Sequence, residues 1–186
     1  TMASGGDGGG SIRIPAGYTG LPGLKGTAGR IPRGPHTGIH PMTVPLGLLC
    51  RSIRDIARYY DVVSGYDSRD PYSLPGPTGW ERTLGSHLGD LHGARVAIVA
   101  DLGVATVRPA IADLVRDAGE QLARDVGLRV VDVDLAFPGL GIEWALGNLA
   151  SLRADLEGRW PECRELLSGE IAFGLEIASQ MVNLDV

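Results

Sequence analysis

The chain has 186 residues, of which 44% are apolar and 21% charged, so it is long enough for one globular domain with a buried core. Its net charge of −5 and its lack of a basic run argue against nucleic-acid binding, which needs clustered Lys and Arg to neutralise phosphates. No apolar run approaches the ~20 residues that cross a bilayer, and the N-terminal residues lack the order of a signal peptide. We therefore expect no membrane association and a cytoplasmic location.

The two ends of the chain resemble the middle of a longer sequence rather than natural termini. The chain begins at Thr1 and runs directly into a glycine-rich loop, with no preceding element predicted to anchor that loop. It ends on an apolar run, residues 181–186, rather than on a polar tail. We expect further sequence on both sides. Cys50 and Cys163 lie far apart, without Cys-x-x-Cys spacing or clustered His, so we predict two buried thiols and no metal site.

Glycine and proline are dense in residues 1–45 and predict turns and short extended pieces there. Apolar residues punctuate this stretch, which favours an ordered scaffold over a solvated linker. After the apolar run of residues 44–49, Ser52 with Asp55 three residues later predicts a helix start, and Gly65 can close that helix. Residues 66–89 then lose the pattern and are predicted to form a surface loop, with at most a short helical turn.

Residues 95–135 have the pattern of a strand, a helix and a second strand. Residues 95–100 form a compact apolar run typical of a buried strand, and residues 109–126 carry apolar side chains along one helical stripe that Gly127 ends. Residues 130–135 read as the second strand, so a right-handed crossover onto a mixed or parallel sheet is expected. Residues 141–186 are mostly helical in pattern, which gives an α/β class.

The run from Asp7 through three glycines to Ser11 can form a concave nest of backbone N–H groups, because glycine has no Cβ and tolerates positive φ. If Ser11 also opens a helical turn, the helix dipole favours negative charge at the same place. Such a nest could bind a phosphate, or it could stabilise the oxyanion that forms when a serine attacks a carbonyl. A P-loop would end in Gly-Lys-Ser or Gly-Lys-Thr, and a dinucleotide site needs a preceding strand and Gly-x-Gly-x-x-Gly, so acyl transfer fits better.

Residues 5–16, followed by residues 20–32, resemble the central motif and downstream stretch of the amidase signature family. The resemblance continues less sharply through residues 44–61 and 95–135. It implies that residues 1–186 are part of a single domain with a mixed β-sheet covered by helices, lacking the upstream catalytic segment and the C-terminal remainder. It also implies hydrolysis or transfer of amides through an acyl-enzyme.

On this resemblance, Ser11 matches the nucleophile, and Gly8, Gly9 and Gly10, together with the Ser11 N–H, match the oxyanion-hole positions. Asp7 and Arg13 match motif positions that we interpret as supports of the loop. We expect no metal and no organic cofactor. The expected partner is a small-molecule amide, with no nucleic acid and no membrane, and a homodimer is kept as an open alternative.

A serine hydroxyl needs a base to take its proton, and the family uses a Lys relayed through a second serine, both upstream of the motif. The chain has one lysine, Lys25, which matches a different family position and is expected to be structural. Ser4 is too close to Ser11 to match the relay serine and is predicted to lie in the loop. A histidine base is a weaker alternative, for which the chain offers four candidates: His36, His40, His87 and His92.

Three functions remain open. An amidase acting on a linear amide is favoured. A glutamine-dependent amidotransferase subunit is second, because those subunits typically carry Gln where this chain has Ile14, and the stretch after Ile31 also departs. An inactive fragment or binding module is third, because the chain without the Lys and the relay serine would have no useful turnover. Most of the large aromatic side chains are expected to pack in the core rather than to line a pocket: Tyr59, Tyr60, Trp80, Trp144 and Trp160.

Overall fold

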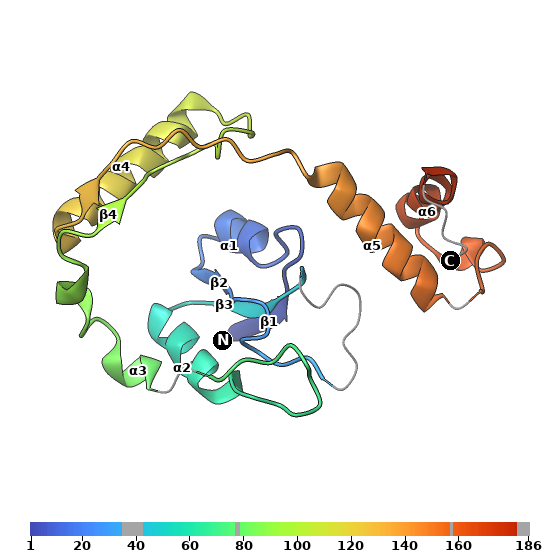
Figure 1. The fold of residues 1–186 in the computed structure, drawn as a ribbon, viewed down its shortest axis with the longest axis horizontal. Helices are drawn as coiled ribbons and strands as arrows, with labels where there is room; N and C mark the ends of the chain where they lie inside the picture. The colour runs from blue at the N-terminus through green and yellow to red at the C-terminus, as the bar shows by residue number, and fades with distance from the viewer. Residues whose placement is uncertain (35–42, 77–78, 157, 182–186) are drawn as a thin grey trace. The chain divides into compact units, whose positions relative to one another are not determined.

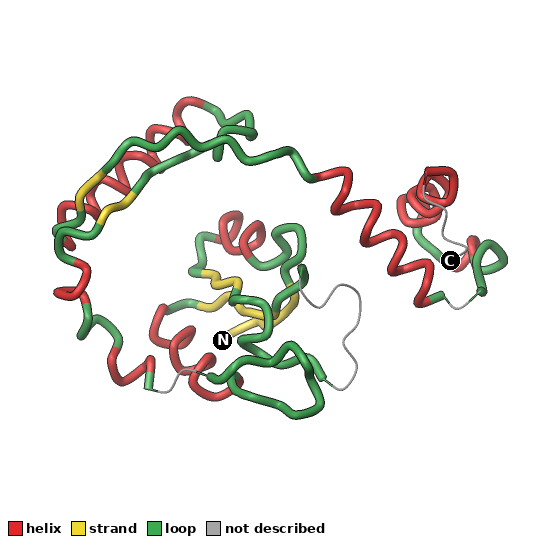
Figure 2. The backbone as a smooth tube through the Cα atoms, in the orientation of Figure 1, coloured by secondary structure: helices red, strands yellow, loops and turns green. Residues whose placement is uncertain are grey.

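The computed structural model describes residues 1–34, 43–76, 79–156 and 158–181, so the base candidates His36 and His40 lie outside the described residues. The described chain forms two compact units. One comprises Thr1–Leu84 and Glu143–Val186, and the other comprises Gly85–Ile142. Figure 1 shows the helices and strands of each unit, and Figure 2 shows the loops that connect these elements.

A three-stranded antiparallel sheet organises the first unit. Its strands are β1 (Met2–Gly6), β2 (Gly23–Lys25) and β3 (Leu46–Cys50), in the order β1-β3-β2. Ser4 on β1 and Leu24 on β2 both pair with Leu48 on the central strand. The expectation that no strand or helix precedes the glycine loop was wrong, because β1 does. The prediction that Ser4 lies in a loop was also wrong, because Ser4 is part of β1. A strand of Ser and Gly has little β-propensity of its own, and pairing with β3 decides its conformation.

Helix α2 (Ile53–Val63) begins where the sequence predicted, because the Ser52 hydroxyl accepts a hydrogen bond from the Asp55 N–H at 3.1 Å. One face of this helix packs on β3 in a core that contains Leu48 and Tyr60. The Tyr60 hydroxyl donates to the Leu24 carbonyl at 3.3 Å, and the Trp80 ring lies 5.6 Å from the Tyr60 ring. Burial of Tyr60 raises its pKa to about 12. Trp80 begins the short helix α3 (Trp80–Thr83), inside the predicted surface loop.

The second unit has the predicted order of strand, helix and strand. Along the chain, η1 (Leu88–Leu91) is followed by β4 (Arg95–Val96), α4 (Pro109–Val126) and β5 (Arg129–Val130). The two strands pair with each other in parallel. Gly127, at φ 75°, ends α4 as expected. Each strand is two residues long and neither is buried, so the prediction of a buried strand over 95–100 was wrong. The predicted second strand over 130–135 is present only at its start. An apolar run indicates burial only where another layer covers it.

Three elements form the C-terminal part of the first unit: α5 (Gly141–Asp155), η2 (Arg164–Leu166) and α6 (Gly169–Met181). Leu175 and Ala178 on α6 are fully buried. Cys50 is buried in the β3 core, whereas Cys163 is partly exposed, so the prediction of two buried thiols was half wrong. Among the residues that the structure describes, no helix is long and apolar enough to cross a membrane.

Candidate active site

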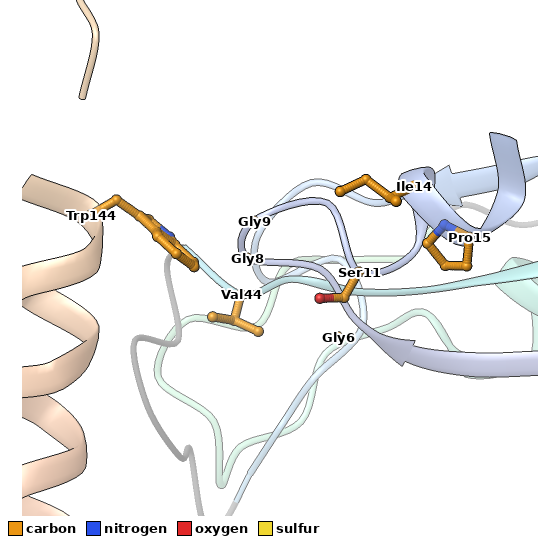
Figure 3. Close-up of a pocket in the computed structure, with 8 residues that line it drawn as sticks. All are labelled: Gly6, Gly8, Gly9, Ser11, Ile14, Pro15, Val44 and Trp144. Atoms are coloured by element: carbon orange, nitrogen blue, oxygen red, sulfur yellow. The ribbon is translucent and has the colours of Figure 1, made fainter. Parts of the chain in front are cut away.

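The loop of residues 7–12 connects the end of β1 to α1 (Arg13–Thr19) and carries the predicted nucleophile (Figure 3). The Asp7 N–H donates to the Pro45 carbonyl at 3.0 Å, which ties the start of the loop to the residues before β3. The Ile14 N–H donates to the Gly10 carbonyl at 2.7 Å and begins the helical turn. Ser11 therefore lies immediately before a helix N-terminus, as the sequence suggested.

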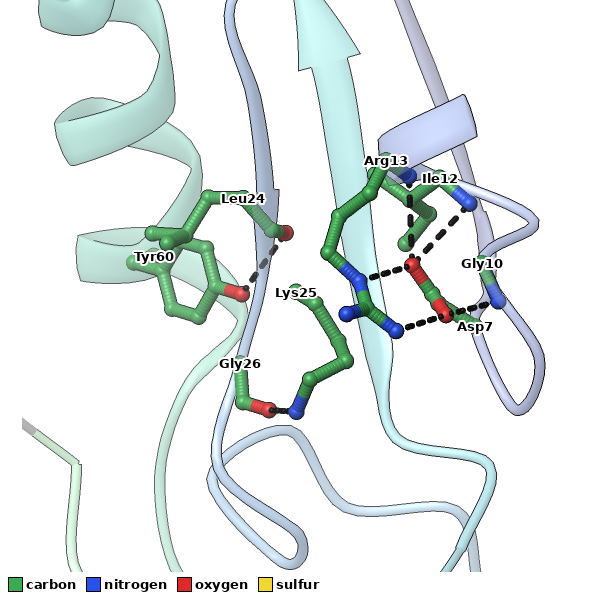
Figure 4. Close-up of polar contacts among 8 residues, drawn as sticks. All are labelled: Asp7, Gly10, Ile12, Arg13, Leu24, Lys25, Gly26 and Tyr60. Carbon is green, nitrogen blue, oxygen red and sulfur yellow. Dashed lines mark hydrogen bonds and ion pairs between the residues drawn. The ribbon is translucent and has the colours of Figure 1, made fainter. Parts of the chain in front are cut away.

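The buried Asp7 carboxylate holds the inside of the loop. It accepts hydrogen bonds from three backbone N–H groups, those of Gly10 at 2.7 Å, Ile12 at 3.2 Å and Arg13 at 3.2 Å (Figure 4). The Arg13 guanidinium adds two contacts of 3.0 Å, one to each carboxylate oxygen. This bidentate geometry is the strong form of an ion pair and fixes the direction of both groups.

These contacts shift the ionisation of Asp7. Hydrogen bonds from the Arg13 side chain are the main cause that holds the pKa of Asp7 well below its usual range. Burial opposes the shift, and the three backbone N–H donors reinforce it. Asp7 is therefore a charged anchor at neutral pH and a poor proton acceptor.

The Asp7 network also determines which backbone donors of the loop remain available. The Gly10 N–H donates to Asp7, although the family resemblance predicted that Gly10 is one of the oxyanion-hole residues. Within the described residues, the N–H groups of Gly8, Gly9 and Ser11 have no hydrogen-bond acceptor. Gly10 has a structural reason to be glycine: its φ is +114°, and a Cβ there would lie 2.6 Å from Cδ1 of Ile14.

A hollow of about 480 Å³ opens beside the loop, and the side chain of Ser11 lies in its lining (Figure 3). The other lining residues come from β1, the loop, α1, the stretch before β3, and α5: Gly6, Gly8, Gly9, Ile14, Pro15, Val44 and Trp144. Val44 and Trp144 are distant from Ser11 along the chain, so no local sequence pattern predicted that they line the same hollow. Core packing was expected for most of the large aromatic side chains, and Trp144 is one that forms part of this wall.

The candidate bases lie elsewhere. Lys25 on β2 donates from Nζ to the Gly26 carbonyl at 3.1 Å (Figure 4). It is not among the residues that line the hollow. His87 contacts Asp90 at 3.1 Å within the second unit, which also contains His92. In the described part of the chain, the Ser11 hydroxyl has no hydrogen-bond partner.

The fold and the loop point to one class of protein. Residues 1–153 match the family model described as Amidase, and the chain belongs to the amidase signature family. The solved structure of a bacterial aryl acylamidase of that family superimposes with a TM-score of 0.78 at 28% identity, over 97% of this chain and 39% of that one. A 6-aminohexanoate cyclic dimer hydrolase gives a TM-score of 0.76 at 27% identity, over 96% of this chain and 39% of its own. The fold is therefore a part of the amidase signature fold, with helices and small sheets.

Among curated proteins, the chain is similar to a glutamyl-tRNA(Gln) amidotransferase subunit of Sphingopyxis alaskensis, at 36% identity over 134 residues. That match covers 72% of this chain and 26% of the relative. The corresponding subunit of Lacticaseibacillus casei is 33% identical over 134 residues, covering 72% of this chain and 27% of the relative. The chain thus spans about a quarter of the length of the curated relatives that it matches.

Proposed function

We propose that the protein hydrolyses a carboxylic amide through an acyl-enzyme on Ser11. The Ser11 oxygen attacks the amide carbon, its proton passes to a base, and the carbonyl oxygen becomes an oxyanion. Collapse of that intermediate breaks the carbon–nitrogen bond as the base gives its proton to the leaving nitrogen, which departs as a neutral amine or ammonia. Water then attacks the ester, which returns the Ser11 hydroxyl and releases the carboxylic acid.

One observation carries this proposal: a serine in an open hollow shares its loop with unengaged backbone donors. The N–H groups of Gly8, Gly9 and Ser11 have no protein acceptor in the described residues, whereas that of Gly10 is engaged by Asp7. We therefore propose Gly8, Gly9 and Ser11 as the oxyanion donors and Gly10 as a residue that shapes the loop. Removal of one such donor typically reduces the rate by about 10²–10³.

Asp7 and Arg13 are proposed to position the loop rather than to react. The buried Asp7 carboxylate points at backbone N–H groups and the Arg13 guanidinium, not into the hollow. Its lowered pKa makes it a weak base at neutral pH. For the base we keep the Lys and relay serine that the family resemblance implies, since no described residue contacts the Ser11 hydroxyl.

A second candidate function is glutamine-dependent amide transfer. Its support is the 36% identity to a relative named for amide transfer. The same attack by Ser11 would release ammonia, which a partner would consume. Ile14 argues against it, because those subunits typically carry Gln at this position.

Labelling of the full-length protein with a small alkyl fluorophosphonate tests the nucleophile. We expect covalent labelling of Ser11, complete loss of labelling in Ser11→Ala, and full labelling in Ser4→Ala, whose exposed side chain on β1 makes it a matched control. Mass spectrometry of the labelled peptide identifies the site. Absence of labelling, together with absence of amide hydrolysis, would overturn the proposal.

A further inference from the structure

The side-chain walls of the hollow beside Ser11 are apolar. They come from Ile14 and Pro15 on α1, Val44 before β3 and Trp144 on α5, and the remaining lining is glycine backbone and Ser11. Ile14 is 55% exposed and Trp144 is 41% exposed, so both keep apolar surface that no described residue covers. No Asp, Glu, Lys or Arg is among these lining residues.

Trp144 lies directly against the glycine loop. A Cβ at Gly9 would be 2.9 Å from Cη2 of Trp144, and one at Gly8 would be 3.4 Å from its Cζ2. The indole ring can approach position 9 this closely because that residue is glycine, whereas 3.4 Å at position 8 is an ordinary van der Waals contact. Figure 3 shows the ring directed from α5 toward Gly8 and Gly9, the backbone that carries two of the proposed oxyanion donors. If a substrate carbonyl accepts hydrogen bonds from these N–H groups, a substituent attached to it would contact the Trp144 ring.

Ile14 bounds the hollow from the helix that follows Ser11 (Figure 3). Its side chain packs over Gly10, where a Cβ would lie 2.6 Å from Cδ1 of Ile14, so the loop conformation and the position of Ile14 depend on each other. The branched side chain is stiff and offers apolar surface with no hydrogen-bonding group. Ile14 thus presents a hydrocarbon surface beside Ser11.

From this arrangement we infer the substrate class, an inference that rests on the proposed function. The hollow binds an uncharged aryl or alkyl group attached to the scissile amide, which contacts Ile14 and Trp144. Transfer of such a group from water to apolar walls is favourable. A charged ammonium or carboxylate, as in free glutamine, would lose water there without gaining a charged partner, which is costly. Ile14 and Trp144 are therefore specificity-determining residues.

The test compares kcat/KM of the full-length protein for amides that differ in this group. Phenylacetamide and hexanamide carry it on the acyl side, acetanilide carries it on the leaving side, and acetamide and glutamine lack it. We expect at least one apolar amide to exceed glutamine by about tenfold or more, the discrimination that an apolar pocket typically provides. Whichever apolar series is preferred shows on which side of the amide the group lies.

Variants then assign the preference to the two side chains. Trp144→Ala and Ile14→Ala should each lower the ratio of kcat/KM for the preferred apolar amide to kcat/KM for acetamide by about tenfold. Trp144→Phe should retain most of the preference because it keeps an aromatic face. Tyr18→Ala is the matched control on α1: Tyr18 is 91% exposed and does not line the hollow, so its substitution should leave the preference unchanged.

Labelling of Ser11 by the small fluorophosphonate separates the two proposals. Labelled wild-type protein that hydrolyses glutamine as well as the apolar amides would overturn the apolar pocket while leaving the nucleophile intact. Labelled Trp144→Ala and Ile14→Ala variants that keep the wild-type preference would do the same. A wild-type protein that is not labelled and hydrolyses no amide would overturn both.

Discussion

Each of the two units contains a helix with an apolar face, but that face is buried in the first unit and exposed in the second. In the first, α2 packs an apolar face on β3, and Leu48 and Tyr60 are almost completely buried. In the second, α4 has an apolar stripe of the same kind, yet Ala123 is the one buried residue of the fully described range 85–142. Leu114, on that stripe, is 64% exposed. An amphipathic pattern thus determines that a helix forms, but only a neighbouring layer determines that its apolar face is buried.

Leu48→Ala should produce the largest effect. Leu48 has 0% exposure in the core between β3 and α2, and truncation leaves a cavity. We expect a loss of about 3–5 kcal/mol in the free energy of unfolding, measured by urea denaturation of the 186-residue chain. A loss below about 1 kcal/mol would mean that this core is not formed as described.

Asp7→Asn should come next, because the active-site loop depends on one buried carboxylate. The substitution removes the charge that Arg13 and three backbone N–H groups contact. We expect a loss of about 2–3 kcal/mol, as is typical of hydrogen bonds to a charged group. Asp67→Asn is the matched control, since Asp67 forms an exposed ion pair with Arg69 and its loss should matter much less. Equal losses in the two variants would contradict the special role of Asp7.

The same carboxylate should make the stability of the first unit depend on pH. The pKa of Asp7 is lowered in the folded state, so its contribution is fully present above its unfolded pKa, about 3.9, and is lost as pH falls toward the folded value. Denaturation midpoints should therefore fall between about pH 5 and pH 2, and fall less steeply in Asp7→Asn. Identical pH profiles for the two proteins would show that Asp7 does not carry this dependence.

Ser52→Ala should have a smaller effect, because it removes one hydrogen bond at the start of α2. We expect a loss of about 1 kcal/mol from the free energy of unfolding. Ser52→Asp should retain most of the stability, since its carboxylate can accept the same Asp55 N–H. Equal loss in both variants would indicate that packing, rather than the cap, is disturbed.

Leu114→Ala should have the smallest effect on the free energy of unfolding. It removes the same atoms as Leu48→Ala, but from an exposed position. Leu114 is 64% exposed on α4, so truncation leaves no cavity. We expect a change within about 0.5 kcal/mol in the 186-residue chain. A loss of several kcal/mol would mean that the apolar stripe of α4 is covered in solution.

Some features of the candidate site could be predicted from the sequence, and others could not. The Asp7–Ser11 run predicted a donor-rich loop before a helical turn, because glycine and serine carry local information about backbone conformation. It could not predict that the Gly10 N–H is engaged by Asp7, since that depends on how the side chain folds back. Nor could it predict that Trp144 and Val44 meet the loop, because contacts between distant segments leave no local pattern.

Features with local causes could be predicted from the order of residues: the Ser52 cap, the Gly127 stop, the order of strand, helix and strand over 95–135, and the loop that carries Ser11. Their determinants lie within a few residues of one another, so chain order is enough to reveal them. Three other features became visible only in the folded chain: Ser4 pairs in a strand, the apolar stripe of α4 is exposed, and Trp144 bounds the hollow. Each depends on which distant segment supplies a hydrogen-bond partner or an apolar surface, and chain order does not specify that.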